Sequence, residues 1–580
     1  MVAPPRTTDR PIVPTPTLFA PPRWDYVPAD LDAGRLEALL PLFDELAARP
    51  LPDAAAIERW LRDESELASR IGAEQARRYV RMTRDTDDAA ARTAYLTIEQ
   101  QVMPEVKVRS DALDKKLLAT PALHDLDRGR FEVLLRQRRT QSRLFRAENT
   151  DLQRQQSELQ TRHQEIAGGT TVEFDGRSLT LQQLGPYFEH QDRDLRERAF
   201  RAGHAARRAH WDELEGIFDR LIALRTAMAR NADFTTYTPY RFAELGRYDY
   251  TETDCRRFHD AIAERVVPAV RRLDRQRAER LSVPRLRPWD LEVDPEGRPP
   301  LQPFATEPEL IALCRRLLEA VDPRFAAELD ELARRDLLDL MSRKGKAPGG
   351  YQYQLEDERV PFIFANGVGV HRDVQTLLHE CGHAFHSLLC RHHDLLAFRD
   401  YPIEIAETAS MSMELLGLEH LGAVYAPDDA KRAYARHLEG LLRTLTWIAS
   451  IDAFQLWVYG KPVHTRDERR TAWLDIRRRF GGDVDWSGLD DALAMQWIAQ
   501  SHLFSHPLYY IEYGIAQVSA LQVWRNYRRS PQQAIAAYRR ALALGGTRPL
   551  PELFAAADVA FDLSPQRLGE LVDDVVARIG

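Results

Sequence analysis

Apolar residues recur three and four positions apart over most of the chain, which is the spacing of one face of an α-helix. This spacing is clear over residues 31–164, for example at 36–46, and again over residues 194–280. It resumes near Glu309 and holds from Ile403 to the C-terminus. The pattern predicts a mainly α-helical protein with a few small strands.

Two short segments depart from the helical pattern. Residues 172–179 turn around Asp175-Gly176, a dipeptide typical of two-residue hairpin turns. Residues 351–355 and 361–365 lie on either side of a turn at 356–359. We expect a β-hairpin in each place.

Proline clusters divide the chain. Residues 1–24 carry seven prolines, and a second cluster of seven lies between Pro284 and Pro308, where we expect a surface connection. We predict an extended Pro-rich arm at residues 1–25, an N-terminal helical domain at 26–193 and a second domain at 194–580.

The composition of the chain narrows the range of expected binding partners. With a net charge of -8, the chain has no global electrostatic reason to bind nucleic acid or an anionic membrane. Its four cysteines form no Cys-x-x-Cys pair. Its first residues do not show the basic start and apolar core expected of a signal peptide, and no stretch of eighteen uncharged apolar residues occurs. We expect a cytoplasmic protein with no nucleic-acid or membrane partner, and the oligomeric state stays open.

The strongest chemical signal is the sequence His379-Glu380-Cys381-Gly382-His383. Residues four apart on a helix differ by about 40° around its axis, so both imidazoles lie on one face, as two ligands of a zinc ion require. Glu380 can reach a water in the site without displacing a ligand, which suits a general base. A chance match to this pattern is the alternative.

A catalytic zinc needs a third protein ligand. Glu404, Glu407 and Glu414 share a face of the next predicted helix, among apolar residues that make unpaired carboxylates costly to bury. We choose Glu407 as the ligand because it is central, which leaves Glu404 or Glu414 to orient a ligand histidine. An exposed acidic stripe is the alternative. Three nearby histidines remain further candidate ligands: His386, His392 and His393.

The densest cluster of Tyr and His follows downstream. It consists of His502, His506, Tyr509, Tyr510 and Tyr513. Phenol hydroxyls that point at a developing oxyanion stabilise a transition state, whereas half-buried packing is the ordinary role of such a helix. Tyr513 and His502 are our first choices for catalysis, followed by Tyr510, and we assign Tyr509 and His506 to substrate binding.

The second hairpin begins just after Gly349-Gly350. Its first strand, starting at Tyr351, offers an edge to which a peptide backbone can add as a further strand, or it is simply structural. We predict that Gly349, Gly350 and Tyr351 contact substrate. Lys344 and Lys346 precede them, and we expect a solvated loop there.

A family resemblance rests on ordered motifs over residues 286–517. They include His379-Glu-x-Gly-His-Ala-x-His386, the segment from Pro402 through Glu407 to Leu416, and His502-Leu-Phe-x-x-Pro507 followed by Tyr513. In these the chain resembles the oligoendopeptidase F branch of the thimet oligopeptidase family of zinc metallopeptidases, which are of the gluzincin type.

The resemblance implies a large helical clam-like fold, with a deep substrate channel and a small sheet beside the zinc helix. It implies one zinc ion held by His379, His383 and Glu407, with Glu380 as the base. The expected activity is hydrolysis of internal bonds in short unstructured oligopeptides. The alternatives are a catalytically silent peptide-binding relative and a dipeptidase that acts at the carboxyl end.

Overall fold

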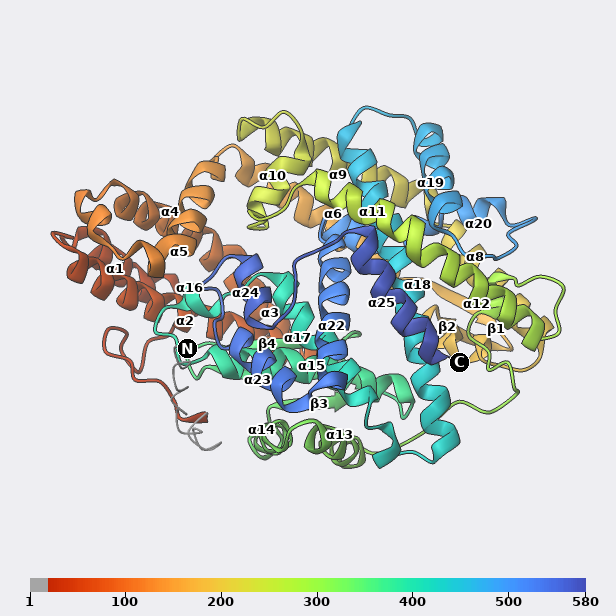
Figure 1. Ribbon diagram of the computed structural model, residues 1–580. Coiled ribbons are helices and arrows are strands. Elements are labelled where there is room, and N and C mark those ends of the chain that lie inside the picture. Colours follow the sequence, from red (N-terminus) through yellow and green to blue (C-terminus); the bar gives the residue numbers. More distant parts are fainter. Residues whose placement is uncertain (1–18, 580) are drawn as a thin grey trace.

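The computed structural model describes residues 19–579, so most of the predicted Pro-rich arm at residues 1–25 lies outside the described residues. Helices dominate, with two small sheets (Figure 1), which confirms the predicted mainly α-helical fold. Within the described range, no helix combines the length and apolar character needed to cross a membrane. The division into domains stays a prediction.

The N-terminal helices pack around a core of their own. Apolar residues between Val27 and Leu135 form it, and Leu395 and Phe398 join them from much later in the chain. Asp53 and Asp127 cap two of these helices by accepting hydrogen bonds from backbone N–H groups of the first turn. The helices are α1 (Leu36–Ala48), α2 (Ala54–Arg84), α3 (Ala89–Thr97), α4 (Met103–Ala119) and α5 (Arg128–Leu144).

The first predicted hairpin is confirmed. Strands β1 (Thr171–Phe174) and β2 (Arg177–Thr180) pair antiparallel, and Asp175 and Gly176 both have positive φ, as the tight turn requires. Helix α8 packs against the hairpin. The helices of this part of the chain are α6 (Asn149–Gly169), α7 (Gly185–Phe188), α8 (Arg193–Arg208), α9 (Trp211–Asn231), α10 (Tyr237–Glu244), α11 (Glu252–Ala261), α12 (Val267–Arg280), α13 (Glu307–Val321) and α14 (Pro323–Arg334).

The second hairpin is also confirmed, as part of a three-stranded sheet of order β3-β5-β4. Strand β5 (Val360–Gly367) is central, pairing parallel with β3 (Leu338–Met341) and antiparallel with β4 (Tyr351–Leu355). In this sheet β4 has one unpaired edge. Strand β5 leads directly into helix α15 (His371–Cys390).

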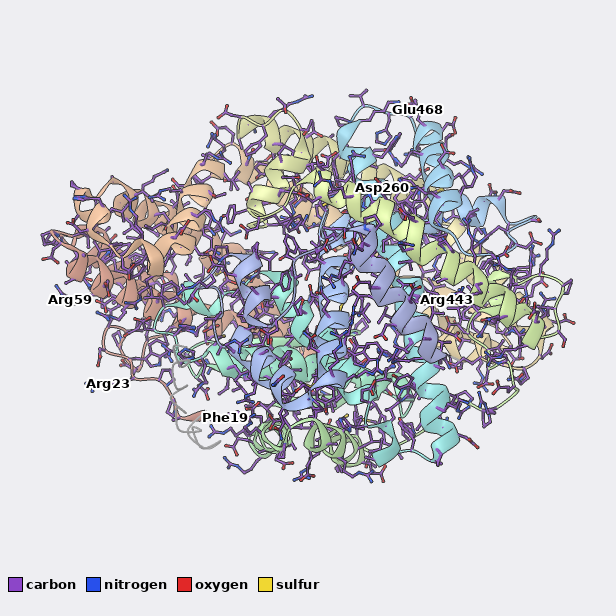
Figure 2. All side chains as sticks on the ribbon, viewed as in Figure 1. Phe19, Arg23, Arg59, Asp260, Arg443 and Glu468 are labelled. Atoms are coloured by element: carbon purple, nitrogen blue, oxygen red, sulfur yellow. The ribbon has the colours of Figure 1, made fainter. Side chains whose placement is uncertain are left out.

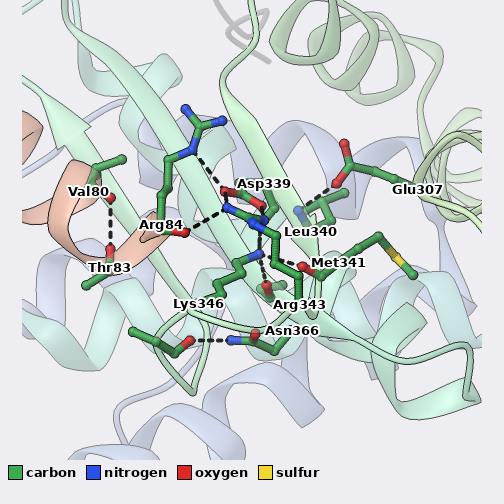
Figure 3. Close-up of polar contacts among 12 residues, drawn as sticks. Val80, Thr83, Arg84, Glu307, Asp339, Leu340, Met341, Arg343, Lys346 and Asn366 are labelled. Atoms are coloured by element: carbon green, nitrogen blue, oxygen red, sulfur yellow. Dashed lines mark hydrogen bonds and ion pairs between the residues drawn. The ribbon is translucent and has the colours of Figure 1, made fainter. Parts of the chain in front are cut away.

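The prediction of a solvated loop at Lys346 is wrong (Figure 3). The Lys346 side chain is buried and donates to the Asp339 carboxylate at 2.7 Å and to the carbonyl of Ala365 at 2.5 Å. Arg343 and Arg84 pair with the same carboxylate, at 2.6 and 3.0 Å. Because Arg84 ends α2, this ion cluster ties the N-terminal helices to the sheet and fixes the turn before β4.

The remaining helices enclose the largest apolar core, in which α15, α17 and α22 are central. In Figure 1 these three labels lie together near the middle of the molecule. The helices are α16 (Leu396–Arg399), α17 (Ile403–Leu418), α18 (Pro427–Gly460), α19 (Arg466–Phe480), α20 (Asp490–Ala494), α21 (His502–Ser505), α22 (Ile511–Arg529), α23 (Pro531–Leu542), α24 (Leu550–Ala556) and α25 (Pro565–Ile579).

Helices α15 and α17 touch backbone to backbone at Gly382. A Cβ atom added there would lie 2.5 Å from Ser410 Cα and 2.6 Å from the carbonyl oxygen of Ala409. Neither atom belongs to a flexible side chain, so any larger residue must push the helices apart. The absence of a side chain at Gly382 therefore sets the distance between the two helices.

We expect Gly382→Ala to lower the free energy of unfolding by about 1–3 kcal/mol, because overpacking outweighs the better helix propensity of alanine. The matched control is Gly440→Ala, in the exposed middle of α18, where an added Cβ meets nothing within 4 Å. That change should stabilise by up to about 1 kcal/mol. Calorimetric unfolding of both variants tests this, and an unchanged midpoint in Gly382→Ala would contradict it.

Candidate active site

Helix α15 presents His379, Glu380 and His383 from its middle turns. The Asp373 carboxylate fixes the start of the helix by accepting hydrogen bonds from three backbone N–H groups, including that of Val370 at 3.0 Å. The two imidazole rings lie 4.9 Å apart, nearly perpendicular. Both histidines therefore face one point beside the helix, as their spacing predicts.

Helix α17 brings Glu407 to the same point. Its Oε2 atom lies 3.3 Å from His379 Nε2 and 3.6 Å from His383 Nε2, and the three ligand atoms all lie within 4.8 Å of one another. Ligands about 2.0–2.1 Å from a tetrahedral zinc stand about 3.3 Å from one another. The donor set and its spacing fit one zinc ion.

The charges at this point also fit a cation. Burial alone would raise the pKa of Glu407, but the neighbouring His383 and His379 outweigh it and hold the pKa at about 2. Burial lowers the pKa of His383 to about 4, so this histidine is a neutral, metal-competent ligand at pH 7. His379 lies between two carboxylates, which outweigh its burial and raise its pKa.

The two flanking glutamates have different partners. Glu414 Oε1 lies 2.7 Å from His379 Nδ1, so it holds the ring from the side opposite Glu407. Glu404 instead accepts a hydrogen bond from the Tyr250 hydroxyl at 2.7 Å. Of the two alternatives left open by the sequence, Glu414 is the one that the structure brings to a candidate ligand.

Glu380 is buried beside the three ligands. Its Oε2 atom has no hydrogen-bond partner among the described residues, and burial raises its pKa to about 7. Gly350 lies against it, since a Cβ atom added at Gly350 would stand 3.7 Å from Glu380 Oε1. Gly349 has a φ of 101°, a conformation that favours glycine. The glycine pair therefore brings backbone close to Glu380.

The other histidines lie elsewhere. His386 is fully buried and stacks on Tyr401, with the ring centroids 3.5 Å apart. His392 and His393 contact backbone carbonyls through ring nitrogens. Among residues 19–579, the side chains whose ligand atoms lie close enough together to hold one metal ion are His379, His383 and Glu407. His386, His392 and His393 do not belong to this group.

The predicted Tyr and His cluster is assembled at the junction of α21 and α22. The His502 ring lies 5.1 Å from that of Tyr510 and 5.9 Å from that of Tyr513, and Tyr509 lies 5.4 Å from Tyr513. Burial, and next the negative charge of Glu407, raise the pKa of Tyr513. Tyr513 therefore stays a protonated hydrogen-bond donor at neutral pH. His506 is exposed, with Nδ1 at 2.8 Å from Ser505 Oγ.

Further residues that sequence reasoning missed position this cluster. Gln500 contacts His502 Nδ1 at 2.7 Å and accepts a hydrogen bond from Trp447. Arg247 pairs with Glu512 at 2.6 Å in a fully buried ion pair. No local pattern marks the Trp447–Gln500 hydrogen bond or the Arg247–Glu512 pair, because packing between distant segments sets both contacts.

Tyr351 contacts the N-terminal helices. Its hydroxyl lies 2.6 Å from Thr83 Oγ1 on α2, and its ring stacks on Phe364 of β5. Its pKa is raised by burial. Tyr351 therefore joins the edge of the sheet to α2, close to the turn of Gly349 and Gly350.

Comparison with known proteins agrees with this geometry. A family model described as peptidase family M3 matches residues 187–567. Oligopeptidase PepF of Bacillus subtilis (strain 168) is 24% identical over 238 residues, which make up 40% of this chain and 35% of that protein. Chromosomal oligoendopeptidase F of Lactococcus lactis subsp. cremoris is 34% identical over 98 residues, 17% of this chain and 16% of that protein. Both matches span only a minor part of those relatives.

A solved structure agrees over nearly the whole chain. PZ peptidase A with inhibitor 2 has a TM-score of 0.87 and 26% sequence identity, and the match covers 96% of this chain and 98% of that chain. The family match extends over more than half of the chain and includes His379, Glu380, His383 and Glu407. The chain therefore belongs to peptidase family M3, with its relatives in the oligoendopeptidase F branch.

Proposed function

We propose that this protein is a zinc-dependent endopeptidase that hydrolyses internal bonds of short unstructured oligopeptides. The observation that carries the proposal is the convergence of His379, His383 and Glu407, with the carboxyl group of Glu380 buried beside them. Membership of a peptidase family supports hydrolysis of peptide bonds, and the finer assignment rests on this arrangement.

His379, His383 and Glu407 would hold the ion. Bound zinc supplies a Lewis acid and lowers the pKa of a coordinated water to about 7. Glu414 fixes the ring of His379 through Nδ1, so that Nε2 faces the metal position. Ser410 donates a hydrogen bond to Glu407 Oε2 at 2.9 Å and orients the carboxylate.

Glu380 is suited to move the proton. Its carboxylate takes a proton from the attacking water and passes it to the leaving amine. Burial raises the pKa of Glu380 to about 7 in the metal-free site, which strengthens this carboxylate as a proton acceptor. Its Oε2 atom has no protein partner among the described residues, which leaves it available for these contacts.

The tyrosines supply hydrogen bonds to the substrate. Tyr513 is our candidate donor to the oxyanion of the tetrahedral intermediate, with His502 beside it. Tyr509 and Tyr510 lie beside Tyr513, and we call the hydroxyl groups of these three residues the tyrosine wall. Exposed His506 stays our candidate for a more distant substrate contact. The unpaired edge of β4, next to Gly349 and Gly350, offers backbone groups to an extended peptide. Backbone pairing favours unstructured peptides of varied sequence.

We expect Glu380→Gln to lower kcat on oligopeptides by about 10²–10⁴-fold, because the proton acceptor is lost while the metal ligands remain. Mass spectrometry of a mixed peptide library measures the internal cuts. Chelation should abolish them and added zinc should restore them. Full cleavage by metal-free protein, or by Glu380→Gln, would contradict the mechanism.

A second prediction distinguishes the roles of Glu404 and Glu414. Glu414→Gln should weaken zinc binding by about 10–100-fold, because the anionic partner of His379 is lost. Glu404→Gln is the matched control on the same helix, since its carboxyl oxygen accepts from Tyr250 and contacts no ligand histidine. Competition with a chromophoric chelator measures both affinities, and equal losses in the two variants would refute the assignment.

A third prediction concerns the tyrosine wall. Tyr513→Phe should lower kcat by about 10²-fold with little change in KM, because the hydroxyl acts mainly on the transition state. The control is Tyr527→Phe on the same helix, whose hydroxyl contacts His420 instead. Steady-state kinetics on one internally cleaved peptide distinguish the two. A change confined to KM would assign Tyr513 to ground-state binding.

A further inference from the structure

A cavity lined by arginines lies where α5 meets α10 and the start of α11. Its volume is about 740 Å³, which suits a small organic ligand. In Figure 1 the orange helix α5 and the yellow-green helix α10 mark its two sides. The residues on which the argument rests are Arg136, Arg139, Arg143, Thr238 and Arg247.

The cavity carries excess positive charge. Arg136 pairs with Asp249 at 3.4 Å, and Arg247 pairs with Glu512 at 2.6 Å. Arg139 and Arg143 line the cavity too, and neither forms an ion pair with any described residue. The one acidic lining residue, Glu252, pairs with Arg256. Two guanidinium charges are therefore left without a balancing carboxylate.

Three buried donors of the lining residues also lack a hydrogen-bond partner among the described residues, and the guanidinium groups of Arg136 and Arg247 lie over the rings of Tyr248 and Phe242. These donors are Nη1 of Arg247, Nε of Arg136 and the hydroxyl of Thr238. The Arg247 side chain is 0% exposed and Thr238 is 2% exposed. Leaving such groups without a hydrogen bond costs about 1–3 kcal/mol each, and arginine cannot escape the cost by losing its proton.

We propose that this cavity binds a phosphate group, either as free phosphate or at the end of a small organic phosphate ester. A phosphate ester carries a charge of about -1.5 to -2 at pH 7 and three strong acceptor oxygens. That charge matches Arg139 and Arg143, and the oxygens match the buried donors of Arg136, Thr238 and Arg247. Arg139 and Arg143 are exposed at the cavity, and guanidinium groups can bind phosphate oxygens in pairs.

The cavity shares a wall with the candidate active site. Arg247 pairs with Glu512 of α22, one residue before Tyr513. Tyr250, which also lines the cavity, donates to Glu404 of α17, one turn before Glu407. A bound phosphate group thus contacts residues that hold both active-site helices, while the site itself contains none of the proposed metal ligands.

Calorimetric titration of the full-length, metal-loaded protein tests the proposal, with metal content measured before and after. The probes are inorganic phosphate, glycerol phosphate and, as a dicarboxylate control, succinate at constant ionic strength. The Arg139→Ala/Arg143→Ala double variant should bind the phosphate probes at least about tenfold more weakly. Titrations repeated in Glu380→Gln keep the result independent of catalysis.

The matched control is Arg59→Ala/Arg198→Ala, which removes two exposed helical arginines that form no ion pair with described residues. Arg59 lies on the outer left side of the molecule in Figure 2, away from α10. This control should bind like the wild type. Thr238→Val should weaken binding without lowering the unfolding midpoint of the free protein, because an unpaired buried hydroxyl is removed.

Preference for glycerol phosphate over free phosphate would identify an organic ester as the ligand, and equal binding would identify the phosphate group alone. Each supports the site. No binding of either probe by folded wild-type protein would overturn the proposal. So would equal binding of succinate, or equal weakening in the two double variants, which would indicate general electrostatic attraction.

Discussion

The candidate active site depends on the backbone contact between α15 and α17. Gly382 lies in α15 between His379 and His383, and it touches α17 at Ala409 and Ser410, less than one turn from Glu407. The contact that brings the helices together is therefore made within one turn of each ligand. A wider separation would draw the Glu407 carboxylate out of reach of both imidazoles, whatever the spacing along each helix.

The carboxylate charges around this helix contact determine which chemistry the site can support. Glu407, Glu414 and Glu380 gather around two histidines in a largely apolar interior, where unpaired carboxylates are costly. In the proposed mechanism, a divalent cation would balance two of these charges and leave the third to exchange a proton. The same burial that makes the site unfavourable without a cation raises the pKa of Glu380 toward neutrality. Burial of the carboxylates thus underlies both features of the proposed mechanism, the bound cation and the proton acceptor.

Local signals in the sequence predicted most of the fold and the centre of the site. The helical spacing, the turn at Asp175-Gly176 and the hairpin before α15 depend on neighbouring residues, and the structure contains each of them. Contacts between segments that are distant in the sequence leave no local pattern, so the sequence did not predict them. Lys346 looked like a solvated lysine because its burial depends on a loop that folds back onto Asp339 of β3 and Ala365 of β5. Likewise, nothing near Glu404 pointed to Tyr250.

The tyrosine wall depends on such distant contacts. Leu508 holds a φ of 60°, which costs a residue with a side chain about 1–3 kcal/mol, and it directly precedes Tyr509. The conformation persists because the Leu508 N–H donates to Gln455 Oε1 at 2.5 Å, and Arg241 donates to the carbonyl of Pro507 at 3.2 Å. Buried polar groups on other helices thus fix the turn that aims the tyrosines, so substitutions at Gln455 act on the same geometry as substitutions at Tyr509 itself.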